Sequence, residues 1–284
     1  MFRRTLLAAL SGAVLSVSFS PPASATVGTA SLDWSQLVLE VLPIPGQPAP
    51  DWSFAQRAGT ASTTALTPDD ASDSHSHTSF NWDHPAAVHS STSHAEGTAV
   101  ASGSMLSATA ASTASPFTAS DPFQQNTASA VASRSANLLL QAPAAVVVTV
   151  PYLLEVSGEM FDFDDYSTAH IGGSAQFQPS SGSGFSSATR AFDLDSRFSA
   201  TSSQSGTLIF GLVVDGAGTV NLSLDANAFS SSHDAIPVPE PSSALQLMAG
   251  LAALGAIALR RGRRWQRGPK AIQAAARAGG LGPK

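Results

Sequence analysis

Polar and apolar residues alternate along much of the chain, and this pattern predicts β-strands. In Thr127–Ser133 an alanine occupies every second position, and in Thr207–Val214 every second residue is a large apolar one. A period of two places one set of side chains on the buried face of a sheet and the other set on its exposed face. Residues 146–150 add a run of β-branched side chains, whose restricted rotamers suit a pleated sheet.

The strongest local prediction is a β-hairpin over residues 207–225. Every second residue of 208–214 is apolar, Asp215–Gly218 follows, and a second alternating run occupies 219–225. A glycine-containing turn between two alternating runs is typical of a hairpin. We therefore expect the two runs to pair with each other in one sheet.

The spacing of the apolar runs predicts the fold class. About eight or nine candidate strands follow one another at short intervals between Leu32 and Phe229, which is the pattern of an all-β protein. We expect an antiparallel β-sandwich over residues 26–236. Within it, the Ser-, Ala- and Thr-rich stretches 60–78 and 104–122 fit either short strands or a looser chain.

Three single residues carry expectations of their own. Trp34 and Trp52 flank the apolar run 37–42, and we expect both rings in the core. Pro151 follows a strand-like run, and because proline donates no ladder hydrogen bond we expect an edge strand or a bulge there.

Composition and charge exclude several classes of function. The chain has no cysteine, which excludes disulfides, thiolate metal sites and cysteine nucleophiles. All 20 acidic residues lie between Asp33 and Glu240 with only four arginines among them, a balance of −16. Such a segment repels nucleic acid and anionic lipid, so we expect no nucleic-acid partner and only weak, multivalent binding of cations.

Residues 1–25 have the pattern of a secretory signal peptide. Arg3 and Arg4 precede the apolar run 6–17, and Ala23 and Ala25 supply the small residues of a cleavage site. We expect a signal helix that is removed before Thr26, with signal peptidase and the export machinery as partners.

Residues 237–264 have the pattern of a membrane-anchored sorting signal. Alternating prolines keep the chain extended up to Pro241, and residues 244–259 form an uncharged apolar stretch expected to be a transmembrane helix. The arginines that follow are expected to stop transfer on the cytoplasmic side of the inner membrane: Arg260, Arg261, Arg263 and Arg264. Residues 265–284 are then a basic cytoplasmic tail whose role the sequence leaves open.

The order Pro239-Glu240-Pro241, apolar helix, arginine cluster resembles the PEP-CTERM sorting signal of Gram-negative bacteria. The resemblance covers about 25 residues of the chain. It implies that an exosortase-type transpeptidase recognises Pro239, Glu240 and Pro241. It also implies that the protein is exported, anchored transiently in the inner membrane, and delivered to the cell surface or extracellular matrix, where it associates with exopolysaccharide.

Two pairs of residues are candidate metal ligands. His75 and His77 share one face of a strand, and neutral imidazoles suit Zn²⁺, although a polar loop in a Ser- and His-rich stretch is the simpler explanation. Asp162 and Asp164 share a face in the same way, and paired carboxylates suit Ca²⁺, although a solvated strand face is the simpler explanation. Neither spacing matches a metal-binding motif, so we expect no tightly bound cofactor.

The sequence favours a structural or adhesive protein over an enzyme. No Gly-x-Ser-x-Gly elbow supports an acyl-enzyme, and the glycine-rich pieces lack the lysine of a phosphate loop. The alternative is a secreted β-sandwich that binds or cleaves carbohydrate. A binding module would need exposed aromatic rings on one face, and a glycosidase would need two facing carboxylates.

Overall fold

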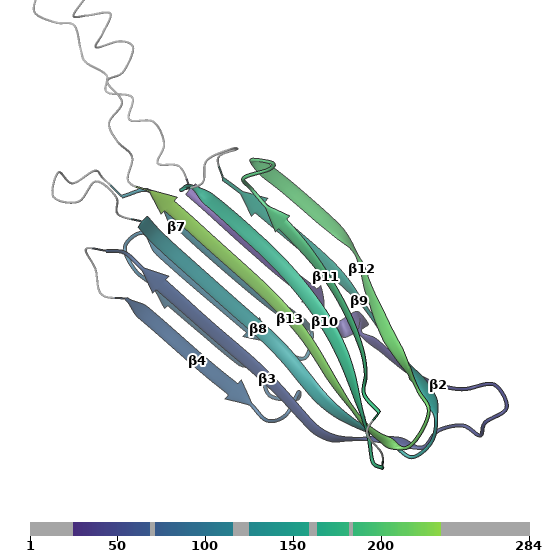
Figure 1. Ribbon diagram of the computed structural model, residues 1–284. Coiled ribbons are helices and arrows are strands. Elements are labelled where there is room, and N and C mark those ends of the chain that lie inside the picture. The colour runs from purple at the N-terminus through teal and green to yellow at the C-terminus, as the bar shows by residue number, and fades with distance from the viewer. Residues whose placement is uncertain (1–24, 69–71, 116–124, 159–163, 182–183, 234–284) are drawn as a thin grey trace, which may run out of the picture. The chain divides into compact units, whose positions relative to one another are not determined.

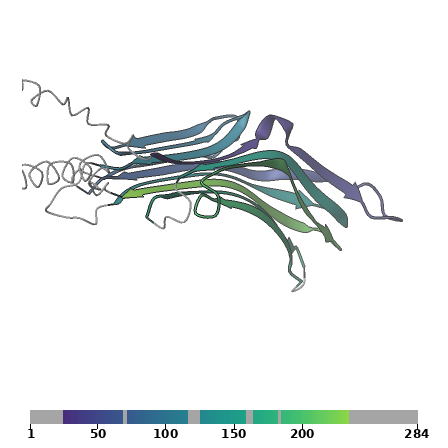
Figure 2. The same ribbon diagram turned by 90° about the horizontal axis from the view of Figure 1, so that it is seen from above.

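The computed structural model describes residues 25–68, 72–115, 125–158, 164–181 and 184–233. This part of the chain forms two antiparallel sheets, and Figures 1 and 2 show them as two layers. The predicted all-β, antiparallel sandwich is thereby confirmed. The expected signal helix (1–25, apart from Ala25) and transmembrane helix (244–259) lie outside the described residues. Within the described ranges no helix is long and apolar enough to cross a membrane.

Sheet A has the strand order β12-β9-β1-β7-β6-β5, and β2 also pairs with β9, beyond the end of β1. Its strands are β1 (Ala25–Asp33), β2 (Val38–Pro43), β5 (Ala86–Ser91), β6 (Ala95–Ala101), β7 (Met105–Thr113), β9 (Ala144–Ser157) and β12 (Thr201–Val214). The short 3-10 helix η1 (Trp34–Gln36) joins β1 to β2.

Sheet B has the order β11-β10-β13-β8-β3-β4. Its strands are β3 (Trp52–Leu66), β4 (Asp73–Ser79), β8 (Gln125–Leu140), β10 (Tyr166–Pro179), β11 (Ser186–Asp195) and β13 (Gly218–His233). Stretches 60–78 and 104–122, where described, are therefore largely strand.

One half of the sandwich interior is filled by small side chains. Every buried residue is Ala, Gly, Ser or Thr in six inner-face segments: 26–30 of β1, 61–65 of β3, 95–101 of β6, 108–112 of β7, 128–132 of β8 and 226–230 of β13. Their strands lie next to one another in register within each sheet. The alanine phase predicted for 127–133 is thus confirmed, and it explains why a chain so poor in large residues can form a core.

Small residues let the two sheets approach closely in this half. A Cβ added at Gly28 of β1 would lie 2.5 Å from the Thr168 carbonyl oxygen and 2.9 Å from that of Phe229, both in sheet B. A Cβ at Gly97 of β6 would lie 2.9 Å from the Ser129 carbonyl oxygen. Backbone here faces backbone, a spacing that larger side chains would not permit.

The other half is filled by large apolar side chains. Alternate residues of β9, β10, β12, β13 and the end of β8 are buried there: Val146, Val148, Val150, Leu208, Phe210, Val220, Leu222 and Leu138 are among them. Phe210 of β12 lies against Gly173 of β10, where an added Cβ would meet its ring. Burying such chains is the main source of stability of a sandwich.

The predicted hairpin at 207–225 is wrong in its pairing. The alternation is as expected, because Leu208 and Val220 and their second neighbours are buried. However, β12 pairs with β9 in sheet A, whereas β13 lies between β10 and β8 in sheet B. Two strands whose apolar faces both point inward produce the same pattern whether they lie side by side or face each other across the core.

Two further expectations need correction. Trp34 is buried as expected, but Trp52 is 42% exposed, because it begins β3 at the rim of the sheet. Pro151 lies within β9, which is not an edge strand. On one side it faces Thr207, and on the other it falls between the residues paired with β1 and those paired with β2. A missing N–H is tolerated at such a gap between partner strands.

Candidate functional site

The outer face of sheet A carries an uninterrupted polar row. Six side chains, one from each of six neighbouring strands, stand opposite one another in register: Ser203, Glu155, Thr29, Thr109, Thr98 and His89. None of them is buried. Because paired strands lie about 4.8 Å apart, this polar row spans about 24 Å from edge strand β12 to edge strand β5.

The chemistry of the polar row is that of hydroxyl groups held at regular spacing. Each threonine hydroxyl donates one hydrogen bond and accepts others. The β-branched side chains of Thr29, Thr98 and Thr109 are stiff at χ1, so their hydroxyls are held with little freedom. Such a surface suits an extended, neutral, polyhydroxylated ligand.

An open groove of about 480 Å³ lies at the β12 end of the polar row. Five of its eight lining residues carry a hydroxyl; the lining consists of Val27, Thr29, Glu155, Val156, Ser157, Thr201, Ser202 and Ser203. Glu155 supplies the single carboxylate of this lining and no cation faces it there. The groove can therefore accept hydrogen bonds from a neutral ligand, but it offers no pair of acid and base.

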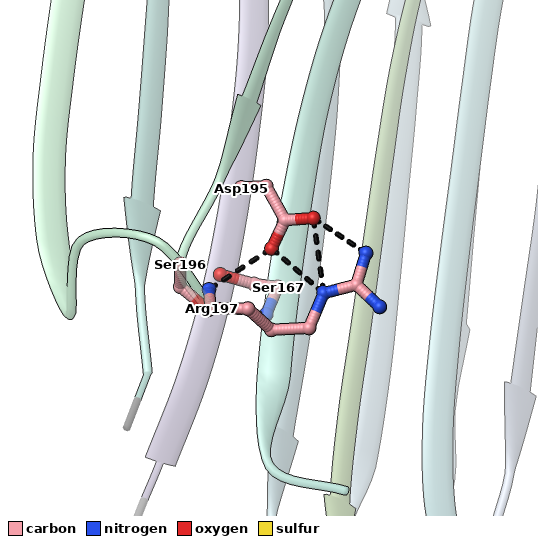
Figure 3. Close-up of polar contacts among 4 residues, drawn as sticks. All are labelled: Ser167, Asp195, Ser196 and Arg197. Carbon is pink, nitrogen blue, oxygen red and sulfur yellow. Dashed lines mark hydrogen bonds and ion pairs between the residues drawn. The ribbon is translucent and has the colours of Figure 1, made fainter. Parts of the chain in front are cut away.

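Ser167 ties the wall of this groove to the opposite sheet. Its Oγ lies 2.8 Å from the carbonyl oxygens of both Val27 and Ser157, which compete for its single proton, and both residues line the groove. Its backbone N–H donates to Ser196 Oγ at 2.8 Å, and Ser196 N–H donates back to the Ser167 carbonyl at 3.0 Å. The turn between β11 and β12 is thereby fixed beside the groove (Figure 3).

Asp195 and Arg197 close the same turn. The backbone N–H of Arg197 donates to Asp195 Oδ1 at 2.9 Å, and its Nε donates to both carboxylate oxygens at 3.0 Å (Figure 3). Burial alone would raise the pKa of Asp195, but the hydrogen bonds from Arg197 outweigh burial and lower it. The same side-chain bonds raise the pKa of Arg197, whose guanidinium also lies 4.4 Å from the Tyr166 ring centre.

A second groove, of about 180 Å³, lies toward the other end of the polar row. It is lined by residues 91–96 and 111–113. Glu96 supplies its carboxylate, and Glu96 Oε1 lies 2.9 Å from Nε2 of His89, the last residue of the row. Each end of the polar row therefore carries one carboxylate.

A cluster of tryptophans and arginines occupies the interior near β3 and β8. Arg134 is 1% exposed, and its guanidinium lies 4.5 Å from the ring centre of Trp34 and 5.8 Å from that of Trp82. Its Nη2 donates to the Trp82 carbonyl at 3.3 Å, while Nε and Nη1 have no protein partner. The cluster borders a cavity of about 10 Å³, room for about one water.

On the outer face of sheet B, His170 is held between two carboxylates. Its Nδ1 lies 2.6 Å from Asp193 Oδ1 and its Nε2 lies 3.4 Å from Asp225 Oδ2. Gly172 leaves the room for this contact, since a Cβ there would lie 2.6 Å from Asp225 Oδ1. The ring makes a hydrogen bond through Nδ1, and Nε2 lies within ion-pair distance of the second carboxylate.

The predicted metal ligands do not converge in the described structure. His75 and His77 lie on the inward-directed face of edge strand β4, where His75 Nε2 is 2.9 Å from Asp73 Oδ1. Asp164 lies before β10, with its Oδ1 3.4 Å from Gln125 Nε2. Asp162 falls outside the described residues. Among the described residues, no three His, Asp or Glu side chains group as a metal site would require.

The predicted processing residues fall almost entirely outside the described ranges. These are Ala23, Pro239, Glu240, Pro241, Arg260, Arg261, Arg263 and Arg264. Ala25 is described: it is the exposed first residue of β1, and Thr26 after it is fully buried. Cleavage before Thr26 would start the mature chain at the first buried residue of the sandwich.

Sequence reasoning missed the polar row because its members are spread over more than a hundred residues. One signal was present: in β1, β6 and β7, Thr29, Thr98 and Thr109 each sit on the phase opposite to the alanines. Only the strand order shows that these positions are neighbours.

No protein-family model matches the chain, and no curated protein matches its sequence significantly.

Proposed function

We propose that the chain is a non-enzymatic, exported surface or extracellular-matrix protein with a structural or adhesive role. Its tail, residues 237–264, would direct its sorting by an exosortase-type transpeptidase at the inner membrane. Its sandwich would associate with exopolysaccharide through the outer face of sheet A.

The polar row is the observation that carries this proposal. It offers hydroxyls from Thr29, Thr98 and Thr109 at about 4.8 Å intervals, with Glu155 in a groove at one end. A polysaccharide presents hydroxyls at regular intervals and can make many weak hydrogen bonds along such a row. Many weak contacts on one chain give strong overall binding through high effective concentration, which suits adhesion.

The positions of the carboxylates argue against a glycosidase at this surface. A glycosidase needs two carboxyl groups about 5–9.5 Å apart. Glu155 of β9 and Glu96 of β6 are separated by β1 and β7, which places their backbones about 14 Å apart or more. No Asp or Glu is buried among the described residues.

One observation favours the alternative of a carbohydrate-binding module with an aromatic platform. Trp52 is 42% exposed, and its ring packs edge-on against Phe54 with centroids 5.6 Å apart. A sugar ring could stack on this surface, which lies on sheet B. The two surfaces are separate, so variants distinguish them.

The test is co-sedimentation of the full-length protein with exopolysaccharide from the cells that export it. We expect the triple variant Thr29→Val, Thr98→Val, Thr109→Val to lose most binding, because valine keeps the shape and removes the hydroxyl. The matched control is Thr78→Val, Thr168→Val, Thr189→Val on the outer face of sheet B, which should bind as the parent does. Unchanged binding by the first variant, with binding lost in Trp52→Ala, would favour the aromatic platform instead.

A further inference from the structure

Within the described residues, five strands have a side with no partner strand, and four of them have features that oppose pairing with another strand. β4 carries Asp73 and His75, and β11 carries Arg190 and Asp193. β5 has only six residues, and so has β2, which also carries Glu40 and Pro43. Charged residues and short length are the usual protection of sheet edges against association.

The fifth strand, β12, has no such protection. It runs for 14 residues, Thr201–Val214, without a charged residue or a proline. It pairs with β9 on one side, and within the described part of the chain no strand pairs with the other side. Figure 1 shows it at the margin of its sheet. Its free backbone donors and acceptors can take up another strand.

The outer face next to this edge is apolar. Ile209 and Val213 of β12 are 57% and 65% exposed. Ala145 of β9 stands opposite Val213 on one side and opposite Leu42 of β2 on the other. The side chain of Leu42 is 44% exposed. A strand that paired with β12 would extend this apolar surface and cover part of it.

We propose that β12 pairs in antiparallel fashion with β12 of a second copy of this chain, about a two-fold axis at Gly211. Ile209 of each copy then stands opposite Val213 of the other, and residues 208–214 of the two copies form the joined stretch. The edge itself selects this occupant: it requires an uncharged strand with apolar residues at the same period of two, and β12 is such a strand. A two-fold contact of this kind is closed, so it gives a dimer.

Charge does not oppose this contact, although the segment between Asp33 and Glu240 carries −16. Glu155 stands opposite Ser203, outside the joined stretch. Glu40 of β2 lies two strands inward from β12, so the two copies of Glu40 would be about 24 Å apart, beyond the Debye length of about 8 Å. The inference does not depend on the proposed function, because it concerns residues 208–214 of β12, outside the groove at Thr201–Ser203, and a different partner.

The test uses the absence of natural cysteine in the chain. Full-length Ile209→Cys and Val213→Cys are purified in mild detergent and oxidised separately and as a mixture. Opposite residues of paired strands have Cα atoms about 4.5–5.5 Å apart, within disulfide range, so we expect a covalent dimer in the mixture and little in either variant alone. Gly211 is left unchanged, because a Cβ there would lie 2.3 Å from the Val146 carbonyl oxygen.

The matched control is Ala191→Cys on edge strand β11, which should give no dimer. Equal cross-linking by this control would overturn the proposal. In sedimentation, Ile209→Lys should raise the dimer dissociation constant at least about tenfold with unchanged circular dichroism. A parent that stays monomeric while its β12 amides are protected from hydrogen exchange would also overturn it, because another segment of the same chain would then cover the edge.

Discussion

The guanidinium carbon of Arg134 lies 4.5 Å above the ring centre of Trp34, inside the sandwich. Among the described residues Arg134 is the only buried charged side chain, and no carboxylate is in contact with it. The rings of Trp34 and Trp82 replace part of the hydration that the cation loses on burial. Such a contact offsets only part of the desolvation cost of a buried charge.

We predict that Arg134→Met is at least as stable as the parent, whereas Arg134→Ala is less stable. Methionine fills the space of the arginine stem between the tryptophans and removes the buried charge. Alanine leaves a cavity and should lower the free energy of unfolding by about 2–4 kcal/mol. Urea denaturation followed by tryptophan fluorescence measures the free energy of unfolding of both variants. If Arg134→Met were less stable than Arg134→Ala, the cation itself would stabilise the fold.

The same residue predicts a dependence of stability on alkaline pH. Burial lowers the pKa of Arg134 to about 10, and Asp83 partly opposes the shift. Above that pH the folded chain releases a proton that the unfolded chain still holds, so stability rises with pH. Relative to Arg134→Met, the parent should gain about 1.4 kcal/mol between pH 9 and pH 11. If the free energies of unfolding of the parent and of Arg134→Met changed in the same way between pH 9 and pH 11, the prediction would be contradicted.

Three buried hydroxyls join the two sheets at the other end of the sandwich. Thr26 Oγ1 lies 2.8 Å from Ser112 Oγ and 2.6 Å from Ser230 Oγ, and the two serine oxygens are 2.7 Å apart. We predict that Thr26→Val lowers the free energy of unfolding by about 1–3 kcal/mol, because two buried hydroxyls lose a partner. Thr29→Val, on the exposed face of the same strand, should change it by less than about 0.5 kcal/mol.

A double-mutant cycle separates this network from simple packing. If the loss comes from unpaired hydroxyls, Thr26→Val combined with Ser112→Ala should cost less than the sum of the two single variants. Additive costs in urea denaturation would mean that the hydroxyls act independently.

The close approach of the two sheets at Gly28 can be tested by substitution. Its Cβ would lie 2.5 Å from the backbone oxygen of Thr168, which cannot turn away as a side chain could. We predict that Gly28→Ala lowers the free energy of unfolding by about 1–3 kcal/mol or prevents folding. Gly103→Ala is the control, because nothing lies within 4 Å of its Cβ position. Equal melting temperatures for the two variants would contradict the close approach of the two sheets at Gly28.

The local sequence pattern predicted where strands lie and which face of each is buried, but not which strands pair with one another. The alanine phase of 127–133 and the apolar phase of 208–214 are set by burial of one face, which leaves a trace in the sequence. Whether β12 pairs with β13 or lies in the opposite sheet depends on contacts with residues far along the chain, which leave no such trace. Arg134 had a local signal: it sits on the same phase as Ala132 and Ala136, the phase of the buried residues.

The proposed sorting function of residues 237–264 gives the last prediction, because Glu240 is the only charged residue between Asp234 and Arg260. A carboxylate inside hydrocarbon costs about 2.5–3.5 kcal/mol on insertion scales, so Glu240 should mark the outer membrane boundary. We expect the flanking prolines to keep it extended, a form that a protease can bind. We predict that Glu240→Ala leaves export intact but blocks release, so that uncleaved protein accumulates in the inner membrane.

Replacing Arg260, Arg261, Arg263 and Arg264 by glutamine should act at a different step. Without the positive charges the apolar stretch 244–259 is no longer stopped in the membrane, so retention before processing should weaken. Cell fractionation with an antibody against the sandwich separates the two outcomes, one in the inner-membrane fraction and one in the soluble export fraction. If Glu240→Ala protein is released as efficiently as the parent, residues 237–264 act as a membrane anchor and not as a sorting signal.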